Sequence, residues 1–189
     1  MFYNMLTIRG TYSVGGNGPN GTYVFYDKGS YSNGWRYIAA YPIQSKFGLK
    51  WSNSDTLVGT ENPNTTIAWP YIDDSNAAIA STVGDSKTNT DLIINVFGSQ
   101  SCLAGLARYY GASGGNGTYS THMASVGELY WAWRNNVPNI LWGIIHSSNE
   151  GWSSPTTNVQ VMNNGGNGQM SLLAKSNTGG GYYLPIIYF

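Results

Sequence analysis

Hydrophobic and polar positions along the chain divide it into a β-rich beginning, a helical middle and a β-rich end. Residues 22–26 and 35–40 are aromatic and β-branched runs, a composition that favours strands. Glycine, asparagine and serine are frequent in 27–34, so this stretch is predicted to be the turn between the two strands. Residues 50–86 show little periodicity, and we expect an irregular segment there.

Helical periodicity follows in the middle of the chain. Asn89 can cap a helix over 90–97, and 101–110 places apolar residues on one helical face. A further helix is predicted to begin at Ser125, because Ser125 and Glu128 form a capping-box pattern ahead of an aromatic and apolar run. The middle of the chain is therefore expected to hold two or three helices.

The C-terminal part of the chain is predicted to be all-β. Four strand candidates are separated by Gly, Asn and Ser, and they cover 139–146, 157–162, 169–176 and 182–189. Strands followed by helices and then by more strands predict an α+β fold with a C-terminal antiparallel sheet. The length fits one domain, 1–189, in which 1–21 is a candidate N-terminal connecting segment.

Composition excludes several classes of partner. Charged residues make up only 10% of the chain, and nine basic residues balance nine acidic ones. Nucleic-acid binding needs clustered Lys and Arg, which this sequence lacks. No run of about 20 apolar residues predicts membrane insertion, and the first residues lack the pattern of a signal peptide. We expect a virion protein or a domain of a longer surface protein, located outside cells.

Residues 24–37 read Val-Phe-Tyr-Asp-Lys-Gly-Ser-Tyr-Ser-Asn-Gly-Trp-Arg-Tyr. This stretch resembles the opening signature of the Lcl C-terminal-like domains, a family found in bacterial surface proteins and phage tail proteins. Further motifs of that family are similar, in the same order, to 84–93, Ser125 with Glu128 and Leu129, 147–150, and Pro185 with Phe189. The resemblance implies a C-type-lectin-like fold close to the formylglycine-generating-enzyme branch. That branch includes hypervariable phage receptor-binding proteins, whose binding residues lie on the C-terminal strands and their loops.

The sequence departs from the family pattern where two closing arginines are replaced by leucine and isoleucine. The carboxylates of Glu128 and Glu150 therefore lack the Arg partners that the pattern implies, and burying an unpaired carboxylate is costly. Two alternatives follow. Either Arg36, Arg108 or Arg134 substitutes, or Glu150 faces solvent and is free to bind a ligand.

Residue types that carry catalysis or bind metals are scarce. Cys102 is the only cysteine, and His122 and His146 are the only histidines. Cys102 lies on the apolar face of a predicted helix, where a buried structural cysteine is the common outcome. Calcium sites need several oxygen ligands, and the pair at 73–74 is more typical of a solvated loop. We expect no enzyme activity, no catalytic residue, no metal site and no cofactor.

Recognition by neutral side chains is the remaining chemistry. The Tyr, Trp, Ser, Gly and Asn that dominate this chain give adaptable contact surfaces at low entropy cost. Strand alternation places Val159 and Val161 in the core and the residues between them outward. In 169–176 the same argument places Met170, Leu172 and Ala174 inward, and the residues that alternate with them outward.

The predicted ligand-binding surface follows from this alternation and from the adjoining loops. It consists of Glu150, Trp152, Asn158, Gln160, Met162, Asn163, Asn164, Gln169, Ser171 and Lys175. The alternative is that these residues form only a solvated sheet face. The remaining tryptophans are expected in the core: Trp35, Trp51, Trp69, Trp131, Trp133 and Trp142.

These expectations combine into one functional hypothesis. The chain would be a non-enzymatic adhesin or receptor-binding domain for a host-surface glycan or protein, displayed on a phage tail fibre or a bacterial cell surface. Single contacts of this kind are weak, so we expect a homo-oligomer, with a trimer favoured. The alternative is a structural virion protein, a tail or capsid decoration without a receptor of its own.

Overall fold

The computed structural model of the chain describes residues 11–46, 48–52, 54–60, 82–114, 119–140, 143–150, 158–164, 169–177, 179 and 181–189. For residues 111–114, 160, 163, 164, 169 and 170 it describes the backbone only. In chain order the elements are the 3₁₀-helix η1 (Pro19–Gly21), β1 (Tyr23–Ser32), β2 (Trp35–Ala40), β3 (Gln44–Ser45), α2 (Ser86–Phe97), α3 (Leu103–Gly114), β4 (His122–Met123), α4 (Val126–Arg134), β5 (Gly143–Glu150), β6 (Asn158–Asn164), β7 (Gln169–Ala174), β8 (Tyr182–Tyr183) and β9 (Pro185–Tyr188). Strands precede and follow the helices, which confirms the predicted α+β class. Among the helices of these ranges, none is long and apolar enough to cross a lipid bilayer.

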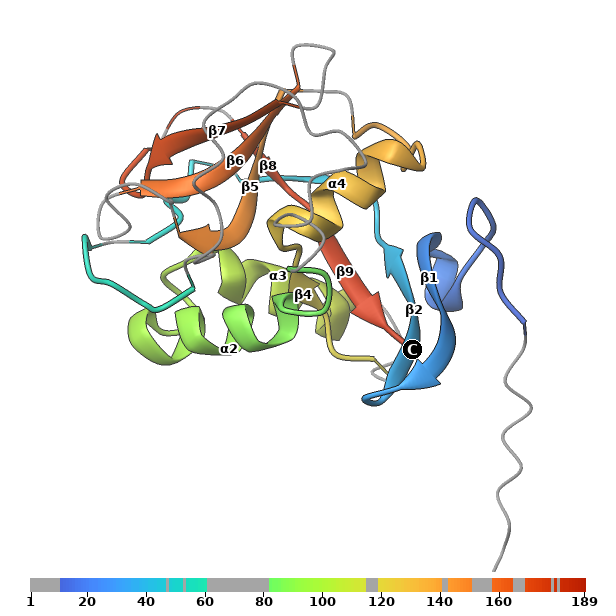
Figure 1. Cartoon of the computed structure of the whole chain (residues 1–189). Helices are drawn as coiled ribbons and strands as arrows, with labels where there is room; N and C mark the ends of the chain where they lie inside the picture. The colour runs from blue at the N-terminus through green and yellow to red at the C-terminus, as the bar shows by residue number, and fades with distance from the viewer. Residues whose placement is uncertain are drawn as a thin grey trace, which may run out of the picture.

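The strands form two sheets (Figure 1). The order β1-β2-β9-β4 makes a four-stranded antiparallel sheet. The order β3-β8-β5-β6-β7 makes a five-stranded sheet in which β5 and β8 run parallel, so the prediction of an antiparallel C-terminal sheet is wrong for that pair. Only Leu184 separates β8 from β9, so one short stretch of chain belongs to both sheets.

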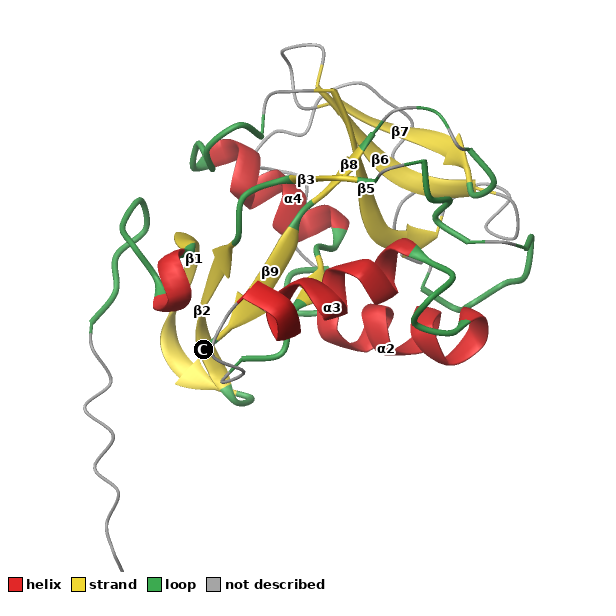
Figure 2. Cartoon of the chain, turned by 180° about the vertical axis from the view of Figure 1, so that it is seen from behind, coloured by secondary structure: helices red, strands yellow, loops and turns green. Residues whose placement is uncertain are grey.

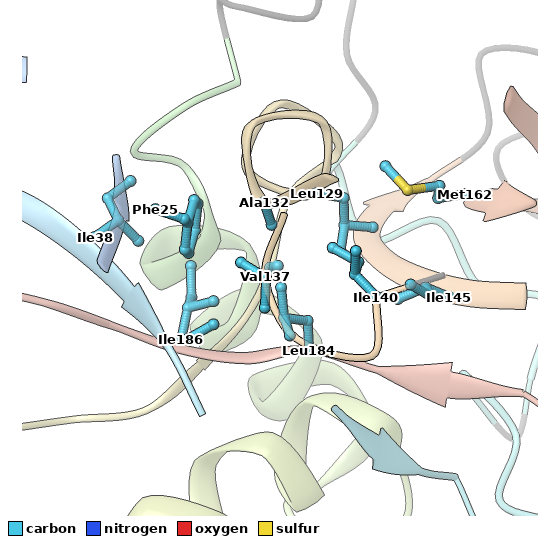
Figure 3. Close-up of a cluster of buried hydrophobic side chains, with 12 residues drawn as sticks. Phe25, Ile38, Leu129, Ala132, Val137, Ile140, Ile145, Met162, Leu184 and Ile186 are labelled. Carbon is cyan, nitrogen blue, oxygen red and sulfur yellow. The ribbon is translucent and has the colours of Figure 1, made fainter. Parts of the chain in front are cut away.

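Helix α4 packs against strands of both sheets (Figure 3). Its residues Leu129 and Ala132 belong to a buried cluster with Phe25 of the four-stranded sheet and with Ile145 and Met162 of the five-stranded sheet. Burying a Leu, Phe or Met side chain is worth about 1.5–3 kcal/mol. The cluster therefore joins the two sheets in one core.

Helices α2 and α3 lie side by side on the other face of the five-stranded sheet (Figure 2). Ile93 and Leu103 of these helices share a buried cluster with Val159, Val161 and Tyr183. The prediction that Val159 and Val161 face the core is confirmed.

Two helix starts test the capping predictions. The hydroxyl of Ser125 accepts from the Glu128 N–H at 3.3 Å, and the Ser125 N–H donates to Glu128 Oε2 at 2.7 Å, so the predicted capping box is confirmed. Helix α2 begins at Ser86, so Asn89 lies inside it and its predicted role as a cap is wrong. The buried Asn89 amide donates to Ser148 Oγ at 3.3 Å, and this bond to β5 explains a polar residue at that position.

The β1–β2 hairpin is longer than predicted. Strand β1 continues to Ser32, which pairs with Trp35, and the turn is reduced to Asn33 and Gly34. Both turn residues have positive φ, 51° and 85°, as a two-residue type I′ turn requires. Most of the stretch predicted as a turn is therefore strand.

Candidate functional site

Two residues of the predicted ligand surface are buried as an ion pair. Glu150 and Lys175 both have 0% exposure, and the Lys175 ammonium donates to Glu150 Oε1. The Glu150 carboxylate also accepts the N–H groups of Val58, Gly59 and Thr60 at 2.8, 2.8 and 3.0 Å. The prediction that Glu150 and Lys175 contact a ligand is wrong, because their charges satisfy each other inside the protein.

The orientation predicted for β6 and β7 also needs correction. Met162 is fully buried against α4, while its neighbour Val161 is buried on the opposite face, so β6 is covered on both sides. In β7, Leu173 pairs with Val159 and packs into the α2–α3 cluster, whereas Ala174 is exposed. Leu173 was predicted to face outward and Ala174 inward, and for these two residues the prediction is wrong.

Little of the predicted surface remains exposed in the described part of the chain. Asn158 and Ser171 are partly exposed. Trp152 lies outside the described residues, as do the side chains of Gln160, Asn163, Asn164 and Gln169. The structure thus places three of the ten predicted residues in the core and leaves two at the surface.

Partly exposed aromatic rings gather at a different place. Tyr26 of β1, Trp35 of β2, and Trp131 and Trp133 of α4 are each partly exposed. All four rings also pack against the buried cluster that joins the two sheets, so the prediction of core positions for the three tryptophans is confirmed only in part. Trp51 is fully buried as predicted. The remaining core predictions, Trp69 and Trp142, lie outside the described residues.

Ring contacts join these residues into a continuous series. The Tyr26 centroid lies 6.3 Å from that of Trp35 and 5.6 Å from that of Trp131. The buried Tyr130 ring continues the series, at 5.4 Å from Trp131 and 6.2 Å from Trp133. These distances fall within the range of favourable aromatic pairs. The five rings, Tyr26, Trp35, Tyr130, Trp131 and Trp133, are referred to below as the aromatic row.

The two tryptophans of α4 lie on different sides of the helix. Trp131 and Trp133 are two residues apart, which corresponds to about 200° around an α-helix. Both rings nevertheless pack against the buried cluster that contains Leu129 and Ala132. The spacing therefore predicts different sides of α4 for the two rings, but it does not predict how far each is exposed.

Trp35 is held in place from two sides. Its ring stacks on Tyr188, with centroids 5.1 Å apart and planes at 19°. A Cβ atom on Gly84 would come within 3.3 Å of Trp35 Cζ2, and Gly84 has a φ of +104°, so a side chain there would be strained and would press on the ring. The Lys28 ammonium lies 3.7 Å from the Trp35 ring centroid, a cation–π contact.

A buried hydrogen-bond network lies behind the row. The Tyr188 hydroxyl contacts the Ser86 hydroxyl and donates to Glu128 Oε1, which also accepts from the Gly84 N–H at 3.0 Å. Burial raises the pKa of both Glu128 and Tyr188 above their ordinary values. The network links α2, α4 and β9, so the ring that supports Trp35 is anchored to three elements.

Two of the arginines considered as carboxylate partners bind elsewhere. Arg36 makes two hydrogen bonds to Asp27, at 2.8 and 2.9 Å, and they lower the pKa of that carboxyl group. Arg108 donates to Asp91 at 2.6 Å. The partner of Glu150 is Lys175, which the sequence did not indicate.

Groups with reactive or metal-binding side chains are buried or scattered. Cys102 has 1% exposure, its thiol donates to the Gly98 carbonyl at 3.3 Å, and burial raises its pKa. The expectation of a buried Cys102 is confirmed. In the part of the chain that the structure describes, three or more metal-ligating side chains do not come together.

Comparison with protein families, with curated proteins and with solved structures finds no match to this chain. The resemblance to the Lcl C-terminal-like domains therefore stays a prediction from the sequence.

Proposed function

We propose that this chain is a non-enzymatic adhesin or receptor-binding domain that recognises a host-surface glycan or protein through the aromatic row. The observation that supports this most directly is the partial exposure of four rings in one series, in which the buried Tyr130 connects Trp131 with Trp133. The resemblance noted in residues 24–37 supports a C-type-lectin-like form of the α+β fold. It also supports display outside the cell, on a phage tail or a bacterial surface.

The physical properties of the row suit a neutral ligand. Aromatic side chains offer large contact areas and lose little conformational entropy, because each has only two side-chain torsions. Trp35 is already fixed by Tyr188 and Gly84, so binding would not have to order it. A glycan, which combines apolar ring faces with many hydroxyls, matches such rings in a chain with only 10% charged residues.

The test is binding of the purified chain to intact host cells and to a glycan array. Trp133→Ala and Lys28→Ala should each weaken binding, Trp133→Ala by at least about tenfold, as expected when a tryptophan that contacts the ligand is truncated. Tyr109→Ala is the matched control, because Tyr109 is 66% exposed and lies on α3 rather than in the row. Thermal unfolding of each variant separates lost binding from lost folding.

The outcome distinguishes the two surfaces considered. Undiminished binding by folded Trp133→Ala and Lys28→Ala variants would reject the row. If binding is lost only in Trp152→Ala and Gln160→Ala, the contact surface lies on the C-terminal strands and their loops, as predicted from the sequence. Binding to host cells without any glycan on the array would identify a protein receptor.

One observation favours the alternative of a structural virion protein. Strand β7 is the last strand of the five-stranded sheet, and Gln169–Ala174 contains no charged residue. Sheet edges are usually protected by charges or proline against pairing with another chain. Oligomers that dissociate on Ala174→Lys substitution, together with no binding to host cells, would favour this alternative.

A further inference from the structure

Two basic side chains are fully buried on the same face of the five-stranded sheet. Gln44 pairs with Tyr183, and the Lys46 N–H donates to the Gly181 carbonyl at 3.0 Å, which continues the β3–β8 pairing. His146 pairs with Tyr183 from the other side. Because paired residues and residues two apart share a face, Lys46 and His146 lie on one face, with β8 between them. Both have 0% exposure.

The residue between them is a glycine. A Cβ atom on Gly181 would lie only 3.1 Å from His146 Nε2, so the imidazole ring leans over this glycine. Adjacent strands are about 4.8 Å apart and each residue rises about 3.3 Å, so the backbones of Lys46 and His146, two strands and two residues apart, are separated by about 12 Å. Two long side chains at that separation can reach one small ligand above Gly181.

Both side chains have unused hydrogen-bonding capacity. The Lys46 ammonium has three donors, and within the described part of the chain one of them is used, in a hydrogen bond to the Asn177 carbonyl at 2.7 Å. Within the described ranges no carboxylate forms an ion pair with Lys46, unlike Lys175 with Glu150. Neither ring nitrogen of His146 has a hydrogen-bond partner among the residues that the structure describes. More than nine in ten buried polar groups are hydrogen-bonded, so a buried imidazole without partners beside a buried ammonium with spare donors is unusual.

We propose that Lys46 and His146 form a buried binding site for a small monovalent anion, which sits above Gly181 and bridges β3 and β5. An ammonium and a neutral imidazole N–H offer donors, so they select an acceptor. Burial favours a ligand whose negative charge offsets that of Lys46. Burial and then the charge of Lys46 lower the pKa of His146 to about 3, so at neutral pH the ring contributes one N–H and Lys46 contributes the charge.

The test uses chloride as the probe. Thermal unfolding of the chain is measured at pH 7 in chloride and in methanesulfonate, a bulkier anion, at equal ionic strength. The midpoint should rise in chloride alone, by roughly 3–5 °C for each tenfold increase above the dissociation constant.

Three variants locate the effect. Lys46→Met removes the charge and keeps the side-chain length, and Gly181→Ala keeps both basic groups but places a methyl group beside His146 Nε2. Both variants should lose the chloride dependence. Lys87→Met is the control, because Lys87 is an exposed lysine of α2 and its loss should leave the dependence unchanged.

The proposal is overturned if chloride and methanesulfonate give equal midpoints in the unaltered chain. It is also overturned if the chloride dependence persists in Lys46→Met and Gly181→Ala. Should those variants fail to fold, the ³⁵Cl line width of the unaltered chain decides. A broadening that saturates with chloride, accompanied by a shift of the His146 ring ¹⁵N resonances, supports the site, and the absence of either rejects it.

Discussion

Two carboxylates, Glu128 and Glu150, have the same burial but different partners. Each is fully buried, and each accepts backbone N–H groups from a distant segment: Gly84 for Glu128, and 58–60 for Glu150. Glu150 also has the ammonium of Lys175. Glu128 instead has a phenol, that of Tyr188, and within the described ranges no basic group pairs with it.

The difference shows that burial alone does not determine how a charge is tolerated. The ion pair needs Glu150 to be ionised, and removing either partner leaves an uncompensated charge in the core. Burial raises the pKa of Glu128, so its neutral form is favoured in the folded protein. Removing a donor from Glu128 then leaves one hydrogen bond unmade. The stability of the protein is therefore expected to depend on the charge at Glu150 but not on a charge at Glu128.

Acidification is expected to have the largest effect on the free energy of unfolding. It destabilises the protein through the buried histidines and stabilises it through the buried carboxyl group of Glu128. The pKa values of His122 and His146 are lowered to about 3 by burial and next by Arg108 and Lys46, respectively. Because the unfolded value is about 6.5, their contribution to stability is complete above that pH and is lost as the pH falls toward 3. Two groups shifted in this way lose roughly 5 kcal/mol of unfolding free energy by about pH 4.5.

Glu128 opposes this loss, because a raised carboxyl pKa favours the folded state as the pH falls. Urea unfolding between pH 7 and about pH 4.5 measures the sum. His146→Phe should reduce the slope by more than half, because it removes one of the two lowered histidine pKa values and leaves the opposing contribution of Glu128. A free energy that stays constant over this pH range would contradict the assignment of neutral buried imidazoles.

Breaking the Glu150 pair should have the next largest effect. Glu150→Gln leaves the Lys175 ammonium buried without its counter-ion, and we expect a loss of about 3–5 kcal/mol in unfolding free energy. The double variant Glu150→Gln with Lys175→Met removes both charges and should recover at least half of that loss. Urea unfolding at pH 7 compares them. If Glu150→Gln lowers the free energy of unfolding by less than about 1 kcal/mol, the ion pair of Glu150 and Lys175 is not shielded from water.

The corresponding change at Glu128 should be the smallest of the three. Tyr188→Phe keeps the ring that stacks on Trp35 but removes the hydroxyl that donates to Glu128. One lost hydrogen bond predicts a decrease of about 1–2 kcal/mol. The same urea unfolding measures it, and near-ultraviolet circular dichroism checks that the aromatic packing is retained. A loss as large as that of Glu150→Gln would mean that the two carboxylates are alike after all.

Local sequence patterns predicted the parts of the fold that depend on residues close together in the chain. The start of α4 was predictable because Ser125 and Glu128 are three residues apart, and both partners of the capping box lie in one segment. The strands at 22–26 and 35–40 were predictable from their composition alone.

The candidate site depended on contacts that local patterns do not contain. Alternation assumes one buried face, but β6 is covered by α4 on one side and by α2 and α3 on the other, so Met162 was placed wrongly. Lys175 was expected at the surface because lysine is usually exposed. It is buried because it pairs with Glu150, which lies 25 residues away in the sequence. Neither outcome could follow without knowing which elements cover the sheet.

The short stretch 182–188 has a mechanical consequence. It contributes β8 to one sheet and β9 to the other, with Leu184 fully buried between them. Because the two sheets share this stretch, unfolding of one sheet disturbs the other, and partial unfolding that leaves one sheet intact is disfavoured. Slow amide exchange should therefore spread evenly across both sheets, and the protein should melt as one cooperative unit.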